Sequence, residues 1–507
     1  MTKSQRHDVA YLPSDIFWMI LVYLEATDIV RSRRVSRAWN AALSNPAVLA
    51  LILKREFPWT TEAKQLSKSS DSQCQSSALE LFDQVTSRCH HLEKGKPRSI
   101  QKYQLCDDFG STGEREWYQV QPWESHSSQP KRFIDRKLSE ALWTVEDRLL
   151  VYPSAKHQCL ALMDLETDRQ FMLPFIICGK VIRRVRLAKR LLVVEWAEPK
   201  AFHWLNESDG VHRHFASSFD VHQNVKQGWD IIPRNEWKIM FLGHPLSERD
   251  RFFSAHSNTH YVIYIWQPNR SLYTADEDAP IESMFVWDIS KESSYRPSSD
   301  PTGRLRDDAP DGSPHIISKF SFRDLDFFGI RQRGCPSIQR LSITDDSQAV
   351  EITENIYGRM ERHGPTTLPE LTTTSIPVAG SGPHWRRKCH DMLPPYRGNC
   401  GLNAEPISSE GVEPDLWFST IGHVADGADV DFYLTFDPSG LGYHCTDSLT
   451  TTTPRCSFTD DKSIDFMGKG KLAGCERYLL GENRNRELII YRFDSPGSWL
   501  LSSAKTD

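Results

Sequence analysis

The segment at residues 11–57 constrains this chain most, because it predicts short helices with more apolar surface than so small a unit can bury. Leu12-Pro13 opens the first helix, where proline is favoured because the first helical position needs no backbone N–H. Ile16, Ile20 and Leu24 then recur every four residues and form an apolar stripe along one face of that helix.

Two more helices are expected in the same segment. Thr27 or Asp28 can cap the second helix, since a short side-chain oxygen accepts hydrogen bonds from the unpaired N–H groups of a helix start. Asn45-Pro46 begins the third helix. The apolar and basic positions of the second helix are Ile29, Val30, Arg33, Val35 and Trp39. Because nearly every turn is apolar on more than one side, part of this surface is expected to bind a partner.

These residues, in this order, resemble the F-box. The pattern of that family is Leu-Pro, two branched residues, Leu, Asp, a basic and apolar stretch, and a Ser-x-x-Trp. The matching positions are Leu12-Pro13, Ile16, Ile20, Leu24, Asp28, Arg33-Arg34-Val35 and Ser36-Arg37-Ala38-Trp39. One departure is conservative, because Asp15 stands where the family often has Glu.

The resemblance implies docking onto the small adaptor subunit of a cullin–RING (SCF) ubiquitin ligase, and through it onto the cullin. By the same resemblance, the adaptor-facing residues include Leu12, Pro13, Ile16, Ile20, Leu24, Ile29, Val35 and Trp39. Asp28 and Arg33 are expected nearer the rim, where charges orient a partner more than they hold it. The sequence leaves open which of Ile20, Leu24, Val35 and Trp39 hold the helices together instead.

The rest of the chain has a different texture. The F-box is expected over residues 8–57, and residues 58–135 are expected to form a linker with one bracing helix near Ser77–Leu92. From residue 136 to 497, short branched and aromatic runs bounded by Gly, Pro, Asn and Asp predict strands. Residues 498–507 are assigned to a tail. The fold class is therefore multidomain α+β, with a small helical domain before a mainly-β domain.

Several of the expected strands end in an aromatic residue or Met followed by Asp, which resembles the strand ends of WD-repeat blades. These are Met163-Asp164, Trp287-Asp288, Phe436-Asp437 and Phe493-Asp494, with Trp204-Leu205-Asn206 as a degenerate copy. The interval from 164 to 206 is 42 residues and that from 206 to 288 is 82, which are about one and two times the 40–45 residues of a propeller blade. The longer later intervals require insertions, near 291–314 and 364–414. A degenerate β-propeller of six to eight blades is expected, with a pair of sandwiches or an irregular barrel as alternatives.

Composition excludes several other classes. With a net charge of −6, the chain is not expected to bind nucleic acid over its whole surface. No apolar run approaches the roughly 20 residues of a membrane span. The 11 cysteines are scattered and form no C-x-x-C pair, so neither a zinc site nor a disulfide framework is expected. The cytosol or the nucleus is the expected location.

No catalytic motif is convincing. Gly380-Ser381-Gly382 lacks the strand–turn–helix setting of a nucleophile elbow, and Gly468-Lys469-Gly470-Lys471 lacks the hydroxyl residue of a P-loop. We therefore expect a non-catalytic substrate receptor without a cofactor, whose protein substrate the sequence does not identify. The alternatives are an adaptor-bound scaffold that serves no ligase and, less favoured, a β-propeller enzyme. If the substrate is phosphorylated, an arginine cluster would bind its phosphate. By composition only, the candidates are Arg183, Arg184, Arg186 and Arg190.

Overall fold

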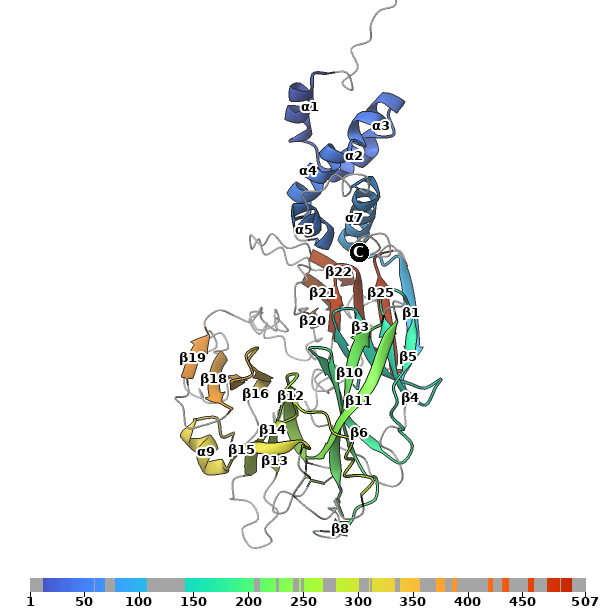
Figure 1. Cartoon of the computed structure of the whole chain (residues 1–507). Helices are drawn as coiled ribbons and strands as arrows, with labels where there is room; N and C mark the ends of the chain where they lie inside the picture. Colours follow the sequence, from blue (N-terminus) through green and yellow to red (C-terminus); the bar gives the residue numbers. More distant parts are fainter. Residues whose placement is uncertain are drawn as a thin grey trace, which may run out of the picture.

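A computed structural model describes most of the helical region and about three fifths of the strand-rich region. The described residues are 12–58, 60–68, 78–106, 142–204, 210–224, 228–239, 246–247, 250–267, 280–300, 310, 312–332, 338–355, 371–378, 385–389, 418–422, 431–436, 455–459, 472–483 and 485–494. The N-terminal helices gather at one end of the molecule and the strands lie at the other (Figure 1).

The N-terminal helices share one hydrophobic core. They are α1 (Ser14–Leu21), α2 (Ala26–Ser32), α3 (Arg37–Leu43), α4 (Pro46–Glu56), α5 (Thr61–Lys68) and α7 (Ala78–Glu93). Leu21, Ile29 and Ile52 from the first four helices are buried together with Phe82 and Val85 of α7. The expected bracing helix is therefore present as α7, because the apolar face of α4 needs a cover that α1–α3 do not provide.

The strands form mostly antiparallel four-stranded sheets, in which successive strands of the chain lie side by side. The first two are β2 (Thr144–Glu146), β3 (Leu149–Ser154), β4 (Cys159–Asp164) and β5 (Gln170–Met172), then β6 (Val181–Ala188), β7 (Leu191–Ala197), β10 (His214–Gln223) and β11 (Trp229–Lys238). The next two are β12 (Arg251–His256), β13 (His260–Gln267), β14 (Ile281–Asp288) and β15 (His315–Phe320), then β16 (Ile338–Ile343), β17 (Ala349–Asn355), β18 (Leu371–Pro377) and β19 (Trp385–Cys389).

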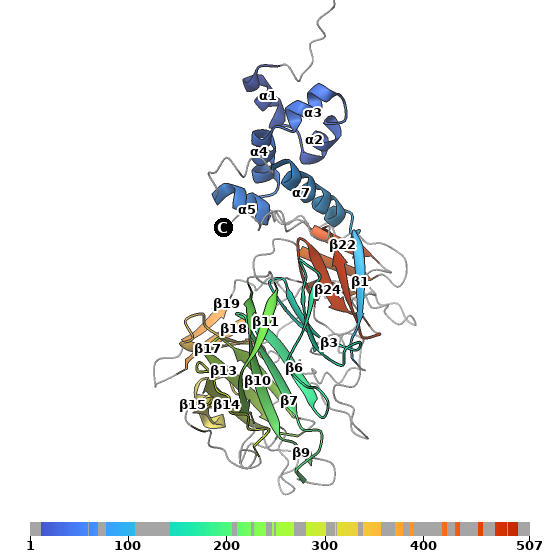
Figure 2. The same cartoon turned by 45° about the vertical axis from the view of Figure 1, so that its right-hand side comes forward.

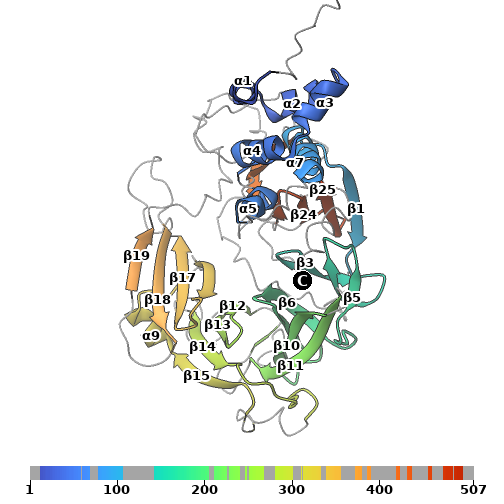
Figure 3. The same cartoon turned by 45° about the horizontal axis from the view of Figure 1, so that its top comes forward.

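Two further groups of strands complete the described sheets. A three-stranded sheet holds β20 (Phe418–Gly422), β21 (Asp431–Phe436) and β22 (Arg455–Thr459), and its β21–β22 pair is parallel. The hairpin of β8 (His203–Trp204) and β9 (Gly210–Val211) stands apart, and the short helix α9 (Phe322–Phe327) follows β15. The sheets follow one another along an arc in Figure 3. A mainly-β domain after the helices is thus confirmed.

The last sheet joins the two ends of the strand-rich region. β23 (Leu472–Cys475), β24 (Tyr478–Glu482) and β25 (Glu487–Arg492) pair with β1 (Ser99–Gln104), and Ile100 lies opposite Tyr491. The expected start of the β region at residue 136 is therefore wrong. In the sequence SIQKYQ of β1, half-buried and exposed residues alternate, and only Ile100 and Tyr103 are apolar or aromatic. Its sequence pattern alone therefore did not indicate a strand of the β region.

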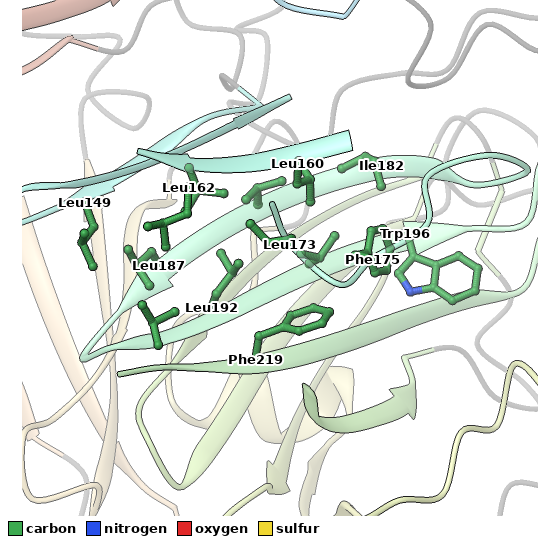
Figure 4. Close-up of a cluster of buried hydrophobic side chains, with 14 of the residues drawn as sticks. Leu149, Leu160, Leu162, Leu173, Phe175, Ile182, Leu187, Leu192, Trp196 and Phe219 are labelled. Carbon is green, nitrogen blue, oxygen red and sulfur yellow. The ribbon is translucent and has the colours of Figure 1, made fainter. Parts of the chain in front are cut away.

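Apolar side chains fill the space between neighbouring sheets. Figure 4 shows Leu160 and Leu162 of β4 facing Ile182 and Leu187 of β6, with Trp196 of β7 at one end of the cluster. Fully buried strands of this kind carry near-continuous branched and aromatic runs, which is why they were recognisable in the sequence. Among the described residues, no helix is long and apolar enough to cross a membrane.

The strand-end motifs have mixed outcomes. Asp164 and Asp288 do end β4 and β14, and each accepts a hydrogen bond from the backbone N–H two residues on, at 2.9 and 2.8 Å. The expected degenerate copy at Trp204 is wrong. Trp204 lies in the separate β8–β9 hairpin, and the strand that follows β7 in the four-stranded sheet is β10. Phe493-Asp494 follows β25 directly, whereas Asp437 lies outside the described residues.

The two expected insertions also differ. Residues 291–300, 310 and 312–314 connect β14 to β15 without a helix or strand, and the remainder of 291–314 lies outside the described residues. The second segment, 364–414, is not wholly an insertion, since β18 and β19 lie within it. Threonine-rich β18 has a strong strand propensity that its Ser- and Pro-rich surroundings obscured. The tail at 498–507 lies outside the described residues.

Candidate protein-binding surface

The first helix exposes large apolar side chains. Ile16 and Met19 lie three positions apart on α1 and are 47% and 68% exposed. Val22 and Tyr23 follow the helix directly, and Tyr23 is 86% exposed. The helix starts one residue later than expected, because Pro13 is its N-cap and its carbonyl accepts a hydrogen bond from the N–H of Phe17 at 3.0 Å.

The expected second helix is in fact two helices, so the segment has four and not three. Ser36 has an extended backbone, and its hydroxyl accepts a hydrogen bond from the N–H of Trp39 at 3.1 Å, which starts α3. The capping residue expected for α2 is also wrong, since Glu25 is its N-cap without a side-chain bond. Asp28 lies in the first turn, where a negative charge complements the helix dipole.

The structure separates the predicted partner-facing residues into three groups by burial. Ile29 is fully buried, and Leu24 and Trp39 pack against the same helical core. Pro13, Ile16 and Val35 are exposed, with Val35 at 68%, and Leu12, Ile20 and Asp28 are half-buried. The exposed apolar set, as we call it, consists of Ile16, Met19, Val22, Tyr23, Val35 and Leu51. Sequence reasoning missed Val22 and Tyr23 and left open whether Met19 contacts a partner, although the i, i+3 spacing of Ile16 and Met19 indicates a shared face.

Two arginines of this region act within the fold. Arg33 makes a bidentate ion pair with Asp83 of α7, with Nη1–Oδ1 and Nη2–Oδ2 distances of 2.7 and 3.1 Å. Arg55 of α4 donates from Nη1 to the carbonyls of Leu21 and Val22 at 2.9 and 3.0 Å, where α1 ends. Those carbonyls have no partner inside the helix, so Arg55 fixes the end of α1 against α4.

A buried ion-pair cluster joins the helices to the last sheet. Arg88 of α7 contacts Glu62 of α5 at 2.8 Å, Asp494 at 2.9 Å and Glu476 at 3.2 Å. Arg477, beside Glu476 in the turn between β23 and β24, contacts Glu62 at 2.5 Å and Asp494 at 3.3 Å. We call these five residues the junction cluster. Their side chains are all nearly inaccessible, so the contact is specific to one relative placement of helices and sheet.

The charges of the junction cluster do not cancel, since three carboxylates face two guanidinium groups. Burial opposes ionisation of Glu62, but the ion pairs with Arg88 and Arg477 outweigh it and lower the pKa of Glu62 to about 2. For Glu476, burial dominates and raises the pKa, with the nearby charge of Glu62 adding to the effect. Of these two glutamates, Glu476 is therefore the one that takes a proton first.

The four arginines that the sequence offered as a binding site for a phosphorylated substrate do not gather on one surface. Arg183 and Arg184 are buried and donate to backbone carbonyls, Arg183 to Asp250 at 2.9 Å and Arg184 to Ser254 at 2.7 Å. Arg186 also reaches the carbonyl of Ser254, at 3.0 Å, whereas Arg190 pairs with Asp147 in a neighbouring turn at 2.9 Å. In the part of the chain that the structure describes, no three His, Cys, Asp or Glu residues gather as metal ligands would.

Comparison with known proteins identifies the helical region. Residues 9–49 match the family model described as F-box-like. No curated protein sequence matches the chain. The matched segment contains α1, α2 and α3 and the start of α4, and with them most of the exposed apolar set. The chain therefore carries an F-box-like domain, a type of domain that serves protein–protein interaction and is typically not catalytic.

Proposed function

We propose that this chain is the substrate-recognition subunit of an SCF-type cullin–RING ubiquitin ligase, acting in the cytosol or the nucleus. In this proposal the F-box-like domain binds the adaptor subunit, and the strand-rich region holds a protein substrate. The chain supplies no catalytic group. It raises the effective concentration of the substrate near the ubiquitin-loaded enzyme that the cullin brings.

The exposed apolar set within the F-box-like domain carries the proposal. Large apolar side chains that stay in water after folding indicate a surface that a partner covers. Ile16 and Met19 supply such side chains on α1, and Tyr23 supplies another just after it. In Figure 2, α1 lies at the far end of the helices from the sheets. Ile29, by contrast, is fully buried, so it supports adaptor binding only by holding the helices together.

For the strand-rich region we infer a degenerate β-propeller of six to eight blades, of which the sheets of the described residues would form six. Two observations support it: the strands of each sheet are consecutive in the chain, and β1 completes the sheet of the last three strands. Turns of different sheets also meet, since Arg190 donates its N–H to Glu146 at 3.0 Å and Ser347 Oγ lies 2.9 Å from Ser257 Oγ. A propeller gives a substrate a broad rigid face, as a receptor needs.

The junction cluster supports the receptor role in a second way. A substrate held on a sheet is presented to a fixed enzyme only if helices and sheets keep one orientation. Arg88 bridges α5, the β23–β24 turn and Asp494 in a single buried contact. Such a contact has few alternative geometries, because any other placement leaves buried charges without partners.

Pull-down from eukaryotic cells tests the proposal. The tagged full chain is compared with an Ile16→Asp/Met19→Asp variant, which places charges in the exposed apolar set. Phe327→Asp is the matched control, because Phe327 is equally exposed but lies on α9. We expect adaptor and cullin with the native chain and the control, and neither with the double variant. Loss of binding in the control as well, or no adaptor with the native chain, contradicts the proposal.

The same experiment separates the alternatives. Adaptor without cullin favours a scaffold that uses the F-box-like domain outside a ligase. Substrates of a true receptor accumulate when Ile16→Asp/Met19→Asp replaces the native chain in cells, whereas partners of a scaffold do not. An enzyme would instead turn over a small substrate in the absence of both subunits.

A further inference from the structure

The stretch from Ile29 to Arg55 holds six basic residues and no acidic one, in a chain whose net charge is −6. Two of the six act within the fold, since Arg33 pairs with Asp83 and Arg55 binds the carbonyls that end α1. Of the other four, Arg31, Arg34 and Arg37 lie within seven positions of each other, on both sides of the exposed Val35. We call these three the arginine group.

The arginine group is exposed and has no acidic partner among the described residues. Arg31 lies in the last turn of α2, Arg34 in the following turn, and Arg37 is the first residue of α3. Asp28, one turn before Arg31, forms no ion pair with it, and Asp83 is already occupied by Arg33. The domain therefore presents three uncompensated positive charges next to an apolar side chain.

Helix stability does not explain the whole group. Arg31 favours α2, since a positive charge at a helix C-terminus complements the dipole. Arg37 has the opposite effect on α3, because it adds a positive charge at the positive end of the helix. A surface that combines apolar side chains with charges of one sign fits a partner with apolar and oppositely charged groups.

We propose that the arginine group faces acidic side chains of the adaptor and speeds its association with the F-box-like domain. This inference rests on the proposed function and assigns to Arg31, Arg34 and Arg37 the orienting role that the sequence pattern gave to Arg33. Charges at the rim of an interface act mainly on the association rate, which then falls as salt screens them. The apolar set supplies most of the affinity and governs the dissociation rate.

Association kinetics of the purified full chain with the purified adaptor test this. The variant Arg31→Glu/Arg34→Glu/Arg37→Glu is compared with Lys94→Glu/Lys96→Glu/Arg98→Glu, which changes the net charge equally. Lys94, Lys96 and Arg98 are also exposed, but they lie between α7 and β1. Arg31→Gln/Arg34→Gln/Arg37→Gln is included as a variant without new charge.

At low ionic strength we expect the association rate constant of the Glu variant to be lower by about tenfold or more, within the range of electrostatic steering. The control variant changes it by less than about twofold, and the Gln variant lies between. The native rate falls steeply with salt, whereas the rate of the Glu variant does not. Equal rates for the native chain and the Glu variant, with adaptor still bound, overturn this inference and leave the proposed function standing. A native chain that binds no adaptor at any salt concentration overturns both.

RNA is the other partner that three exposed arginines fit, and the same proteins distinguish it. If the Glu variant loses affinity for a single-stranded RNA but associates with the adaptor at the native rate, the arginine group serves nucleic acid and the inference is wrong. We expect the reverse, with weak RNA binding that is the same for the native chain and the Lys94, Lys96 and Arg98 control.

Discussion

Arg88 of α7 and Asp494, which follows the last strand, lie 406 residues apart in the chain and form a buried ion pair of 2.9 Å. Glu62 of α5 binds the same guanidinium group, with Nη1–Oε1 and Nη2–Oε2 distances of 3.0 and 2.8 Å. The helical and strand-rich regions are thus held together by buried ion pairs that cross from one to the other, from Arg88 to Asp494 and from Arg477 to Glu62. The stability of each region therefore depends on the other.

Removal of Arg88 is expected to destabilise the whole chain. Arg88→Met leaves the carboxylates of Glu62 and Asp494 buried with fewer partners, which costs about 3–5 kcal/mol. Urea denaturation followed by tryptophan fluorescence measures it. Arg33→Met is the control, because the Asp83 partner of Arg33 is half exposed and such a pair is worth about 1 kcal/mol or less. Equal costs for the two variants would show that the junction cluster contributes no more than a surface pair.

Two carboxylates of the junction cluster are expected to respond to pH in opposite directions. The pKa of Glu62 in the folded chain, about 2, is below its ordinary value. Its ionised form therefore stabilises the fold above about pH 4.5, and this contribution is lost as the pH falls toward 2. Burial raises the pKa of Glu476, so ionised Glu476 destabilises the fold, and the effect disappears as the pH falls through its folded pKa.

Amide substitutions make this contrast measurable. At pH 7, Glu62→Gln is expected to lower the free energy of unfolding by roughly 3 kcal/mol, the value of a pKa difference of this size. Glu476→Gln is expected to be neutral or stabilising, because it removes the surplus negative charge. Thermal unfolding between about pH 2 and pH 8 follows both variants, because the contribution of Glu62 is lost below about pH 4.5. A cost for Glu476→Gln as large as that for Glu62→Gln would contradict the assignment of the surplus charge to Glu476.

The helices near the N-terminus were the most predictable part of this fold. Local signals define them: Asn45 caps α4 through its side chain, and Pro46 takes the first helical position, as expected. The division between α2 and α3 was missed, because Ser36 was interpreted as part of a continuous motif when its hydroxyl in fact starts a new helix. The exposed or buried state of Val35 and Ile29 also could not be read from the sequence, since both are branched and apolar.

Long-range partners escaped the sequence for a physical reason. β1 is recognisable as a strand only through its pairing with β25, almost 400 residues later in the chain. Its own residues alternate only between exposed and half-buried, which is a weak strand signal. The partners of Arg88 come from three separate segments, and none of them has a spacing that marks an ion pair. Strand content, in contrast, was predictable, because buried strands such as β13 carry dense branched and aromatic runs whatever their neighbours are.

Arg55 is expected to control the order of α1 rather than the stability of the whole chain. Arg55→Ala leaves the carbonyls of Leu21 and Val22 without the guanidinium donor, so the end of α1 frays. Hydrogen exchange should accelerate in α1 by about tenfold, equivalent to about 1.4 kcal/mol, while α7 keeps its protection. Lys54→Ala, next in the chain but exposed, is the control and should leave α1 unchanged. Faster exchange in α7 as well would assign Arg55 to the helical core.

Asp164 and Asp288, both found at strand ends, are expected to differ in importance. Asp164 is buried and accepts hydrogen bonds from the N–H of Glu166 and from Nε1 of Trp229 in the next sheet, both at 2.9 Å. Asp288 is half-buried and accepts one from the N–H of Ser290. Asp164→Ala leaves the buried Trp229 N–H unpaired and should cost about 2–3 kcal/mol, against about 1 kcal/mol for Asp288→Ala.

Urea denaturation of the two variants measures these costs. Asp164→Asn is the informative companion, because the amide oxygen can still accept from Trp229 while the negative charge is removed. If Asp164→Asn retains most of the stability that Asp164→Ala loses, the hydrogen bond between the two sheets is what matters. If both variants lose the same amount, the carboxylate acts through its charge on Arg148, whose Nε lies 3.9 Å from it.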